Sequence, residues 1–129
     1  MSDQKTHVPM VIFTRTYDFL SWIIPCTQNF PRSQRFVVTK RLQDAALDFQ
    51  ERIIEANRQS GRARLDCLRQ ADADLDKVRL YLRLAVRWEW LNQGQYRHAA
   101  GQVTEIGRLL GSWKKVTRQS AATRAAGPQ

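Results

Sequence analysis

Three arginines spaced four residues apart are the strongest chemical signal in the sequence. Arg79, Arg83 and Arg87 fall in a long amphipathic segment, and residues four apart on an α-helix differ by only about 40° around its axis. Like charges at this spacing repel each other mildly. The stripe therefore indicates contact with an anion such as a nucleic-acid phosphate. The alternative is a solvated face with local ion pairs, for which Asp76 is placed one turn before Arg79.

Further basic residues follow in the last predicted helix. Arg97, Arg108 and Lys115 are separated by close to whole helical turns and so share one outward face. Basic side chains near a chain end are commonly solvated, but they are also frequent low-specificity contacts to nucleic acid. We predict a nucleic-acid-binding surface that consists of Arg79, Arg83, Arg87, Arg97, Arg108, Lys114, Lys115 and Arg118.

No set of residues fits a catalytic or metal-binding pattern. His7 and His98 stand without a nucleophile and an acid at a suggestive spacing. Asp72, Asp74 and Asp76 resemble the opening of a calcium loop, but a lysine stands where that loop requires glycine. We interpret these aspartates as surface residues, with Asp72 paired with Arg69 and Asp76 paired with Arg79. We predict a protein that is not an enzyme and that uses no metal or other cofactor.

The composition is that of a folded and strongly basic protein. The chain has 129 residues, and its formal net charge of +9 favours partners with phosphates or other acidic surfaces. Its length suffices for one domain with a real core. Cys26 and Cys67 stand in apolar helical stretches, so we expect both to be reduced. The sequence contains neither a membrane-spanning apolar run nor the apolar core of a signal peptide, and we expect a cytoplasmic protein.

Apolar residues at helical spacing predict long helices joined by short loops. We place these helices near residues 10–29, 31–57, 63–91 and 96–118. We expect Pro25 to kink the first helix and Gly61 to end the second in a left-handed conformation. Short connections make neighbours antiparallel, so the predicted fold is all-α, an antiparallel up-down-up-down four-helix bundle. Residues 1–9 would form a flexible arm and residues 119–129 a disordered tail, on either side of a bundle of residues 10–118.

The third predicted helix carries two apolar ridges on nearly opposite sides. One core covers only one ridge, and exposed apolar ridges of this size rarely stay bare. The second ridge therefore predicts an oligomer interface; the alternative is that loops or the kinked end of the first helix cover it. The first ridge consists of Leu68, Ala71, Leu75, Val78, Leu82 and Ala85. The second ridge consists of Leu80, Leu84, Trp88 and Leu91.

Three stretches resemble a group of bacterial four-helix-bundle proteins. The segment FPRSQRF at 30–36 resembles the junction between the first two helices in these proteins. The group includes proteins encoded by ribosomal-RNA intervening sequences and the accessory variability protein of diversity-generating retroelements. The segments LYLRLA at 80–85 and TEIGRLLGSW at 104–113 are more similar to the retroelement member. Asn57-Arg58 stands where the ribosomal branch usually has an acid–glycine pair.

This resemblance, over about residues 13–118, implies a specific function. Accessory proteins of retroelements form barrel-like homopentamers, bind the reverse transcriptase and nucleic acid, and are required for mutagenic copying of a template repeat. The family has no catalytic motif, and its functional residues are basic side chains on the outer surface. Arg79, Arg83 and Arg87 occupy comparable positions in this chain. The resemblance also implies a bacterial or phage-encoded protein.

We therefore predict a non-catalytic basic protein whose partners are a reverse transcriptase, RNA or DNA, and further copies of itself, with no membrane partner. Its expected role is mutagenic retrohoming of a retroelement. The first alternative is a stand-alone RNA-binding bundle. The second is a protein-interaction module whose charge meets an acidic protein. Neither alternative includes a polymerase partner.

Overall fold

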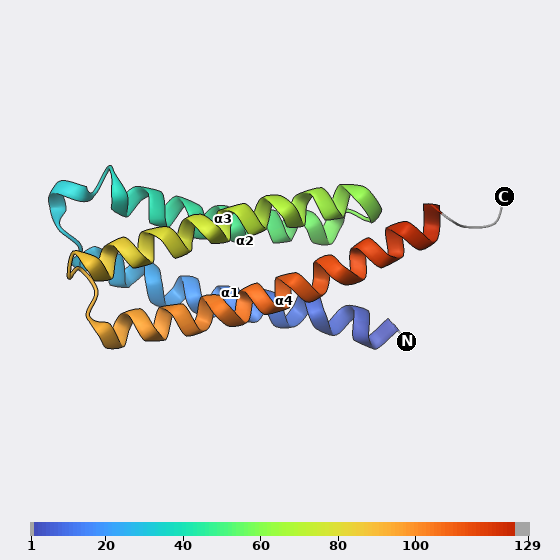
Figure 1. The fold of residues 1–129 in the computed structure, drawn as a ribbon, viewed down its shortest axis with the longest axis horizontal. Coiled ribbons are helices and arrows are strands. Elements are labelled where there is room, and N and C mark those ends of the chain that lie inside the picture. The colour runs from blue at the N-terminus through green and yellow to red at the C-terminus, as the bar shows by residue number, and fades with distance from the viewer. Residues whose placement is uncertain (1, 126–129) are drawn as a thin grey trace.

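The computed structural model describes residues 2–125, and side chains within residues 10–123, as four α-helices with two short 3-10 helices. Successive α-helices run in opposite directions, and α1 begins at the end of the bundle where α4 ends (Figure 1). Each helix packs on the next one, and α4 packs on α1. This arrangement confirms the predicted antiparallel four-helix bundle. The α-helices are α1 (Ser2–Cys26), α2 (Val38–Arg58), α3 (Gly61–Arg87) and α4 (Gln93–Ala125).

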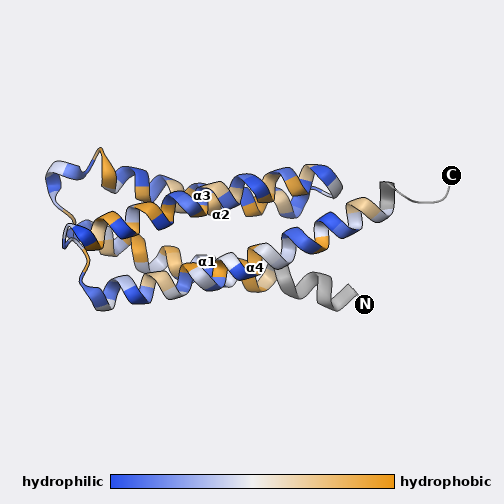
Figure 2. Ribbon diagram, viewed as in Figure 1, coloured by the Kyte–Doolittle hydropathy of each residue, from blue (hydrophilic) through white to orange (hydrophobic). Residues whose placement is uncertain are grey.

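The core lies where the apolar faces of the four helices meet. Every residue of the first ridge of α3 is at most 2% exposed, as predicted. Figure 2 shows hydrophobic and hydrophilic residues alternating along α2 and α3, as expected for helices with one face in the core. Burial of each large aliphatic or aromatic side chain contributes about 1.5–3 kcal/mol. Large core residues of the other helices include Ile12, Phe19 and Ile23 of α1, Leu42, Phe49 and Ile53 of α2, and Val103, Ile106 and Leu110 of α4.

The connection between α1 and α2 differs from the predicted one. Pro25 stands in the last turn of α1, where the α-helix gives way to the 3-10 helix η1 (Thr27–Asn29) instead of continuing past a kink. The proline removes one backbone donor at a point where the helix is already ending. After Pro31 the chain forms a second 3-10 helix, η2 (Arg32–Gln34), so α2 begins only at Val38. Gln43 Nε2 donates a hydrogen bond of 2.8 Å to Thr27 Oγ1 and so connects η1 to α2.

Helix α1 starts earlier and α4 ends later than predicted. The backbone of residues 2–9, expected to be an arm, is helical, and so is that of residues 119–125, expected to be a disordered tail. A single proline at position 9 removes one backbone donor without preventing helical turns on its other side. Alanines at the end of α4 have the highest helix propensity of all residues. The remaining parts of the predicted arm and tail, residue 1 and residues 126–129, lie outside the described residues.

The second ridge of α3 is exposed at two positions, half-buried at a third and buried at the fourth. Leu80 and Trp88 are 41% and 47% exposed, and Leu84 is half-buried. Leu91 is 1% exposed and belongs to the core, so its assignment to an oligomer interface is wrong. The reason is that α3 ends at Arg87 and the chain then turns back on itself. Helical spacing therefore no longer describes where Leu91 points.

Local interactions define the turns at both ends of α3. Glu89 has a φ of 62°, and the backbone N–H groups of Trp90 and Leu91 both donate to the Ala85 carbonyl, at 2.8 and 3.2 Å. The Asn92 and Gln95 side chains then accept hydrogen bonds from each other's backbone N–H groups and so cap the start of α4. At the other end of α3, Gly61 has a φ of 57°, which confirms the predicted left-handed conformation.

Candidate nucleic-acid interface

The outer surface of the contact between α3 and α4, called here the α3–α4 seam, brings together basic residues from both helices. The helices are antiparallel, so residues near the start of α3 meet residues near the end of α4 (Figure 1). At one end the seam has a groove that includes Arg62, Arg69 and Arg118. The middle of the seam contains Asp72, Lys114, Arg79 and Gly107. The other end has a small hollow that Arg83, Tyr96 and Thr104 line, and Arg79 borders this hollow from the middle of the seam.

Arg79 is packed into the middle of the seam. Its Nη1 atom lies 2.8 Å from Asp76 Oδ1, which confirms the local ion pair considered as the alternative for this residue. A Cβ atom on Gly107 would lie 2.5 Å from Arg79 Nη2, so the absence of a side chain on Gly107 makes room for the guanidinium group. The positive charge of Arg79 is thus partly neutralised by Asp76 and partly covered by α4.

Lys114 is also engaged within the protein. Its Nζ atom lies 2.7 Å from Asp72 Oδ2, and its side chain is only 20% exposed. The ion pair joins α4 to α3, and burial makes such a contact stronger than one at the open surface. Lys114 therefore has a structural partner, whereas the sequence pattern had suggested only its use as a nucleic-acid contact.

Four of the predicted residues keep exposed and unpaired charges. Their side chains form no ion pair with a carboxylate of the described residues. Arg83 is one of them, and it lines a hollow of about 150 Å³ at the seam, beside Tyr96 and Thr104. Arg108 differs, because its Nη2 atom lies 3.7 Å from Glu105, which also contacts Arg15 of α1 at 3.2 Å. The four residues are Arg83, Arg87, Arg97 and Lys115.

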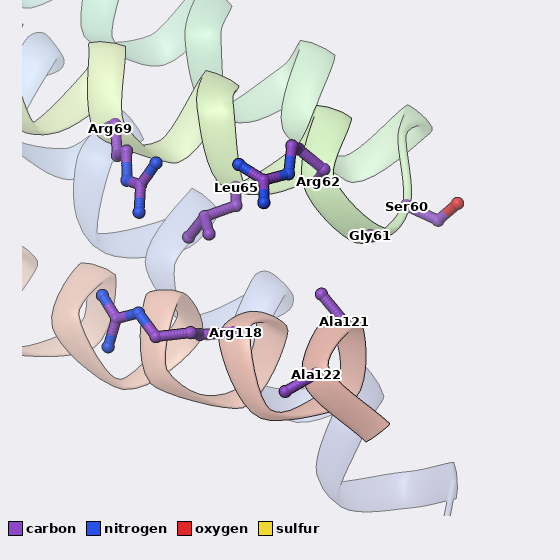
Figure 3. Close-up of a pocket in the computed structure, with 8 residues that line it drawn as sticks. All are labelled: Ser60, Gly61, Arg62, Leu65, Arg69, Arg118, Ala121 and Ala122. Carbon is purple, nitrogen blue, oxygen red and sulfur yellow. The ribbon is translucent and has the colours of Figure 1, made fainter. Parts of the chain in front are cut away.

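The groove at the far end of the seam contains two arginines that were not predicted. It has a volume of about 600 Å³, and Arg62 and Arg69 of α3 line it together with Arg118 of α4 (Figure 3). Arg118 was predicted, and it too is exposed and forms no ion pair within the described part of the chain. The missed signal is a seven-residue spacing: Arg62 and Arg69 are two turns apart, and Arg83 follows after four more turns. Residues seven apart drift by only about 20°.

Of the three neighbouring aspartates, Asp74 is a core residue, so its assignment to the surface is wrong. Asp72 pairs with Lys114 and not with Arg69, so that predicted pair is wrong, whereas Asp76 pairs with Arg79 as predicted. The side chain of Asp74 is 6% exposed and lies 3.4 Å from Arg52 and 3.9 Å from Lys77. Burial raises the pKa of Asp74, Arg52 and Lys77 oppose this shift, and Asp48 adds to it. The error arises because Asp74 stands between Ala71 and Val78, on the side of α3 that faces the core.

The structure offers little that resembles a reactive or metal-binding site. His98 is exposed and packs against Trp22, with 4.7 Å between the ring centroids. Cys26 and Cys67 are free, and burial raises the pKa of the Cys26 thiol. The described residues contain no group of three or more His, Cys, Asp or Glu side chains that could hold a metal ion. Within residues 2–125, none of the helices combines the length and the apolar character needed to cross a membrane.

Two comparisons with known proteins give a match. The model of the bAvd-like family matches residues 10–117. A solved structure of a protein of unknown function, from the S23 ribosomal protein family of Bacteroides thetaiotaomicron, has a TM-score of 0.76 and 24% sequence identity. The similarity covers 84% of this chain and 98% of that one, and it confirms the fold. No curated protein matches the chain.

Proposed function

The chain belongs to the bAvd-like family, and from this we propose that it is a non-catalytic accessory protein that binds a reverse transcriptase and nucleic acid during retroelement copying. The observation that carries the proposal is the family match over residues 10–117. The net charge of +9 and the unpaired basic side chains on α3 and α4 support the nucleic-acid part. The sequence resemblance to accessory variability proteins supports the polymerase part.

The proposed mechanism of nucleic-acid binding is electrostatic. Arg83, Arg87, Arg97 and Lys115 are exposed and free of carboxylate partners within the described residues, so each can contact a phosphate. Each contact releases condensed counterions, which increases the steepness with which log K falls with log[salt], called here the salt slope, by about 0.7 on a single strand. Contacts to phosphates position a protein but carry little sequence information. The polymerase or the shape of the RNA would therefore supply the specificity.

We also propose that the chain associates with further copies of itself through the exposed part of the second ridge. Leu80, Leu84 and Trp88 leave an apolar strip on α3, and contact with further copies of the chain would cover it. The resemblance implies five copies, which would repeat the basic surface around a ring. Light scattering should give an oligomer mass at micromolar concentration. Leu84→Glu should dissociate the oligomer before it unfolds the bundle, and a wild-type monomer would contradict the interface.

The polymerase partner can be tested by co-purification. The tagged protein would be expressed in its native host, and nuclease treatment of the lysate would remove contacts bridged by nucleic acid. A reverse transcriptase that is retained after nuclease treatment supports the proposal. Recovery of ribosomal RNA alone would favour the stand-alone RNA-binding alternative. Recovery of an acidic protein without polymerase would favour the protein-interaction alternative.

The nucleic-acid surface can be tested with two variants that lose the same charge. In the first, Arg83, Arg87 and Arg97 are changed to Gln. In the control, three exposed arginines near the start of α2 are changed to Gln. The first variant should bind RNA several-fold more weakly and with a smaller salt slope than the control. Equal behaviour of the two variants would show that these positions have no special role. The control positions are Arg32, Arg35 and Arg41.

A further inference from the structure

A groove of about 600 Å³ lies between the first turns of α3 and the last described turns of α4. Leu65 and Arg69 extend from α3 toward α4, and Arg118 runs along α4 on the opposite side of the groove (Figure 3). Leu65 and Ala121 give the groove an apolar floor, and Arg62 adds a third guanidinium group. A volume of this size falls within the range of about 300–1,000 Å³ that ligand-binding sites have.

The charge of the groove is one-sided. None of its lining residues is acidic. Beside the groove, Asp66 Oδ1 lies 3.9 Å from Arg69 Nη1, and both side chains are more than half exposed. Such an exposed and distant pair neutralises little charge. Arg62 and Arg118 form no ion pair within the described residues. Three like charges around one hollow repel each other, and a bound anion would offset this repulsion.

Neighbouring interactions hold the walls of the groove in place. Arg64 Nε donates a hydrogen bond of 3.0 Å to the Ala56 carbonyl, and its guanidinium carbon lies 5.8 Å from the ring centroid of Trp113. Because Trp113 is buried, Arg64 fixes the start of α3 to both α2 and α4. The ion pair between Lys114 and Asp72 closes the next part of the seam. These contacts hold both walls of the groove in place, and preorganisation of this kind lowers the cost of binding.

We propose that this groove binds the phosphates of a nucleic-acid strand, at a position separate from Arg83. The proposal rests on the proposed function and adds Arg62 and Arg69 to the contact surface. Guanidinium groups present planar pairs of donors that match phosphate oxygens, and the apolar floor can contact sugar or base. Along α3, Arg69 and Arg83 are separated by about 21 Å, at a rise of about 1.5 Å per residue. This distance corresponds to about six stacked nucleotides at about 3.4 Å each.

The test compares two triple variants by fluorescence anisotropy with a labelled single-stranded RNA of about 12 nucleotides, long enough to span the seam. In the groove variant Arg62, Arg69 and Arg118 become Gln. The control variant carries the Arg32, Arg35 and Arg41 changes to Gln defined above. Both lose three charges at exposed positions, and circular dichroism verifies that both are folded. Compared with the control variant, the groove variant should bind the RNA about tenfold more weakly. Its salt slope should be smaller by about 2, since each of the three lost phosphate contacts removes about 0.7.

The outcomes separate this proposal from the proposed function. If the wild type binds RNA and the two variants are weakened equally, the groove proposal is wrong while the proposed function stands. If the wild type does not bind RNA at low salt, both fail. The binding of a polyglutamate peptide to the wild type and to the groove variant would be measured in the same way. If the three substitutions weaken peptide binding as strongly as RNA binding, the proposal is overturned in favour of an acidic protein partner. A nucleoside monophosphate would also be added as a competitor of RNA. If it displaces the RNA when the two are present at the same concentration of phosphate groups, the proposal is overturned in favour of a free nucleotide as the ligand.

Discussion

The middle of the α3–α4 seam and its two ends contain the same types of basic residue but engage them differently. In the middle, Arg79 and Lys114 each have a carboxylate within 2.8 Å and contribute to the packing of α3 on α4. At the ends, Arg83 and Arg118 are exposed and have no such partner within the described residues. Whether a basic side chain is available to a ligand is thus decided by its neighbours. The spacing of the residue along its own helix does not decide it.

The largest expected difference is the loss of stability on substitution of Arg64 compared with that of Arg62, which stands on the same turn of α3. Arg64→Gln removes a charged hydrogen bond to the Ala56 carbonyl and a contact with the Trp113 ring, so the free energy of unfolding should fall by about 2 kcal/mol. Arg62→Gln should change it by less than about 0.5 kcal/mol, because Arg62 is exposed. Urea denaturation measures both values. Equal losses would mean that Arg64 does not fix α3 to α4.

A smaller difference is expected between the adjacent residues Lys114 and Lys115. Lys114→Gln breaks a half-buried ion pair between two helices and should destabilise the protein by about 1 kcal/mol. Lys115 is exposed, and Lys115→Gln should leave thermal stability nearly unchanged while it weakens RNA binding. Thermal denaturation and an RNA titration of the same two variants would measure the contrast. If Lys115→Gln destabilised the protein more than Lys114→Gln does, the stabilising role of the ion pair between Lys114 and Asp72 would be contradicted.

Single substitutions of Arg83 and Arg79 compare an end of the seam with its middle. Arg83→Gln should weaken RNA binding a few-fold at about 0.1 M salt and reduce the salt slope by about 0.7, the value for one lost phosphate contact. Arg79→Gln should change the slope by much less, because Asp76 partly neutralises this arginine and α4 partly covers it. Anisotropy titrations across a salt series measure both slopes. A loss of slope in Arg79→Gln as large as that in Arg83→Gln would show that the Asp76 ion pair opens when RNA binds.

The smallest effect concerns the acids Asp74 and Asp72. Burial raises the pKa of Asp74 above its usual value of 3.8, so the folded state binds this proton more tightly than the unfolded state does. The resulting contribution to stability is complete below pH 3.8 and is lost as the pH rises through the folded-state pKa. Asp74→Asn should remove this dependence in urea denaturation between about pH 3 and pH 6. Asp72→Asn is the control, and this variant should retain the pH dependence of stability that Asp74 causes.

The fold was predictable because each helix carries an apolar face of its own. The first ridge of α3 is buried as its spacing predicts, and short connections fix antiparallel neighbours. The prediction failed where a turn replaces the helix, as at Leu91, since a helical projection no longer applies there. The prediction also failed at Asp74. It was assigned to the surface because aspartate is a polar residue, although its position lies on the side of α3 that faces the core.

The basic surface was predictable only in part. Periodicity along α3 identified Arg83 and Arg87 as exposed, and the spacing within α4 identified Arg97. No pattern within one helix shows that Lys114 reaches Asp72 across 42 positions of sequence, or that Arg118 shares a groove with Arg62. These relations depend on the register in which α3 and α4 pack, and that register is set by the fit of many side chains together.

The amino-acid sequence alone determined the four helices, their alternating directions, the strong positive charge and the burial of the first ridge of α3 in the core. These properties follow from local propensity, from periodic burial and from composition, each of which is a sum over residues. The tertiary structure decided which charges are neutralised, which side chains meet across the seam, and where a groove opens. Contacts between distant segments settle these points, because electrostatic pairing and packing act over a few ångströms in space, regardless of separation along the chain.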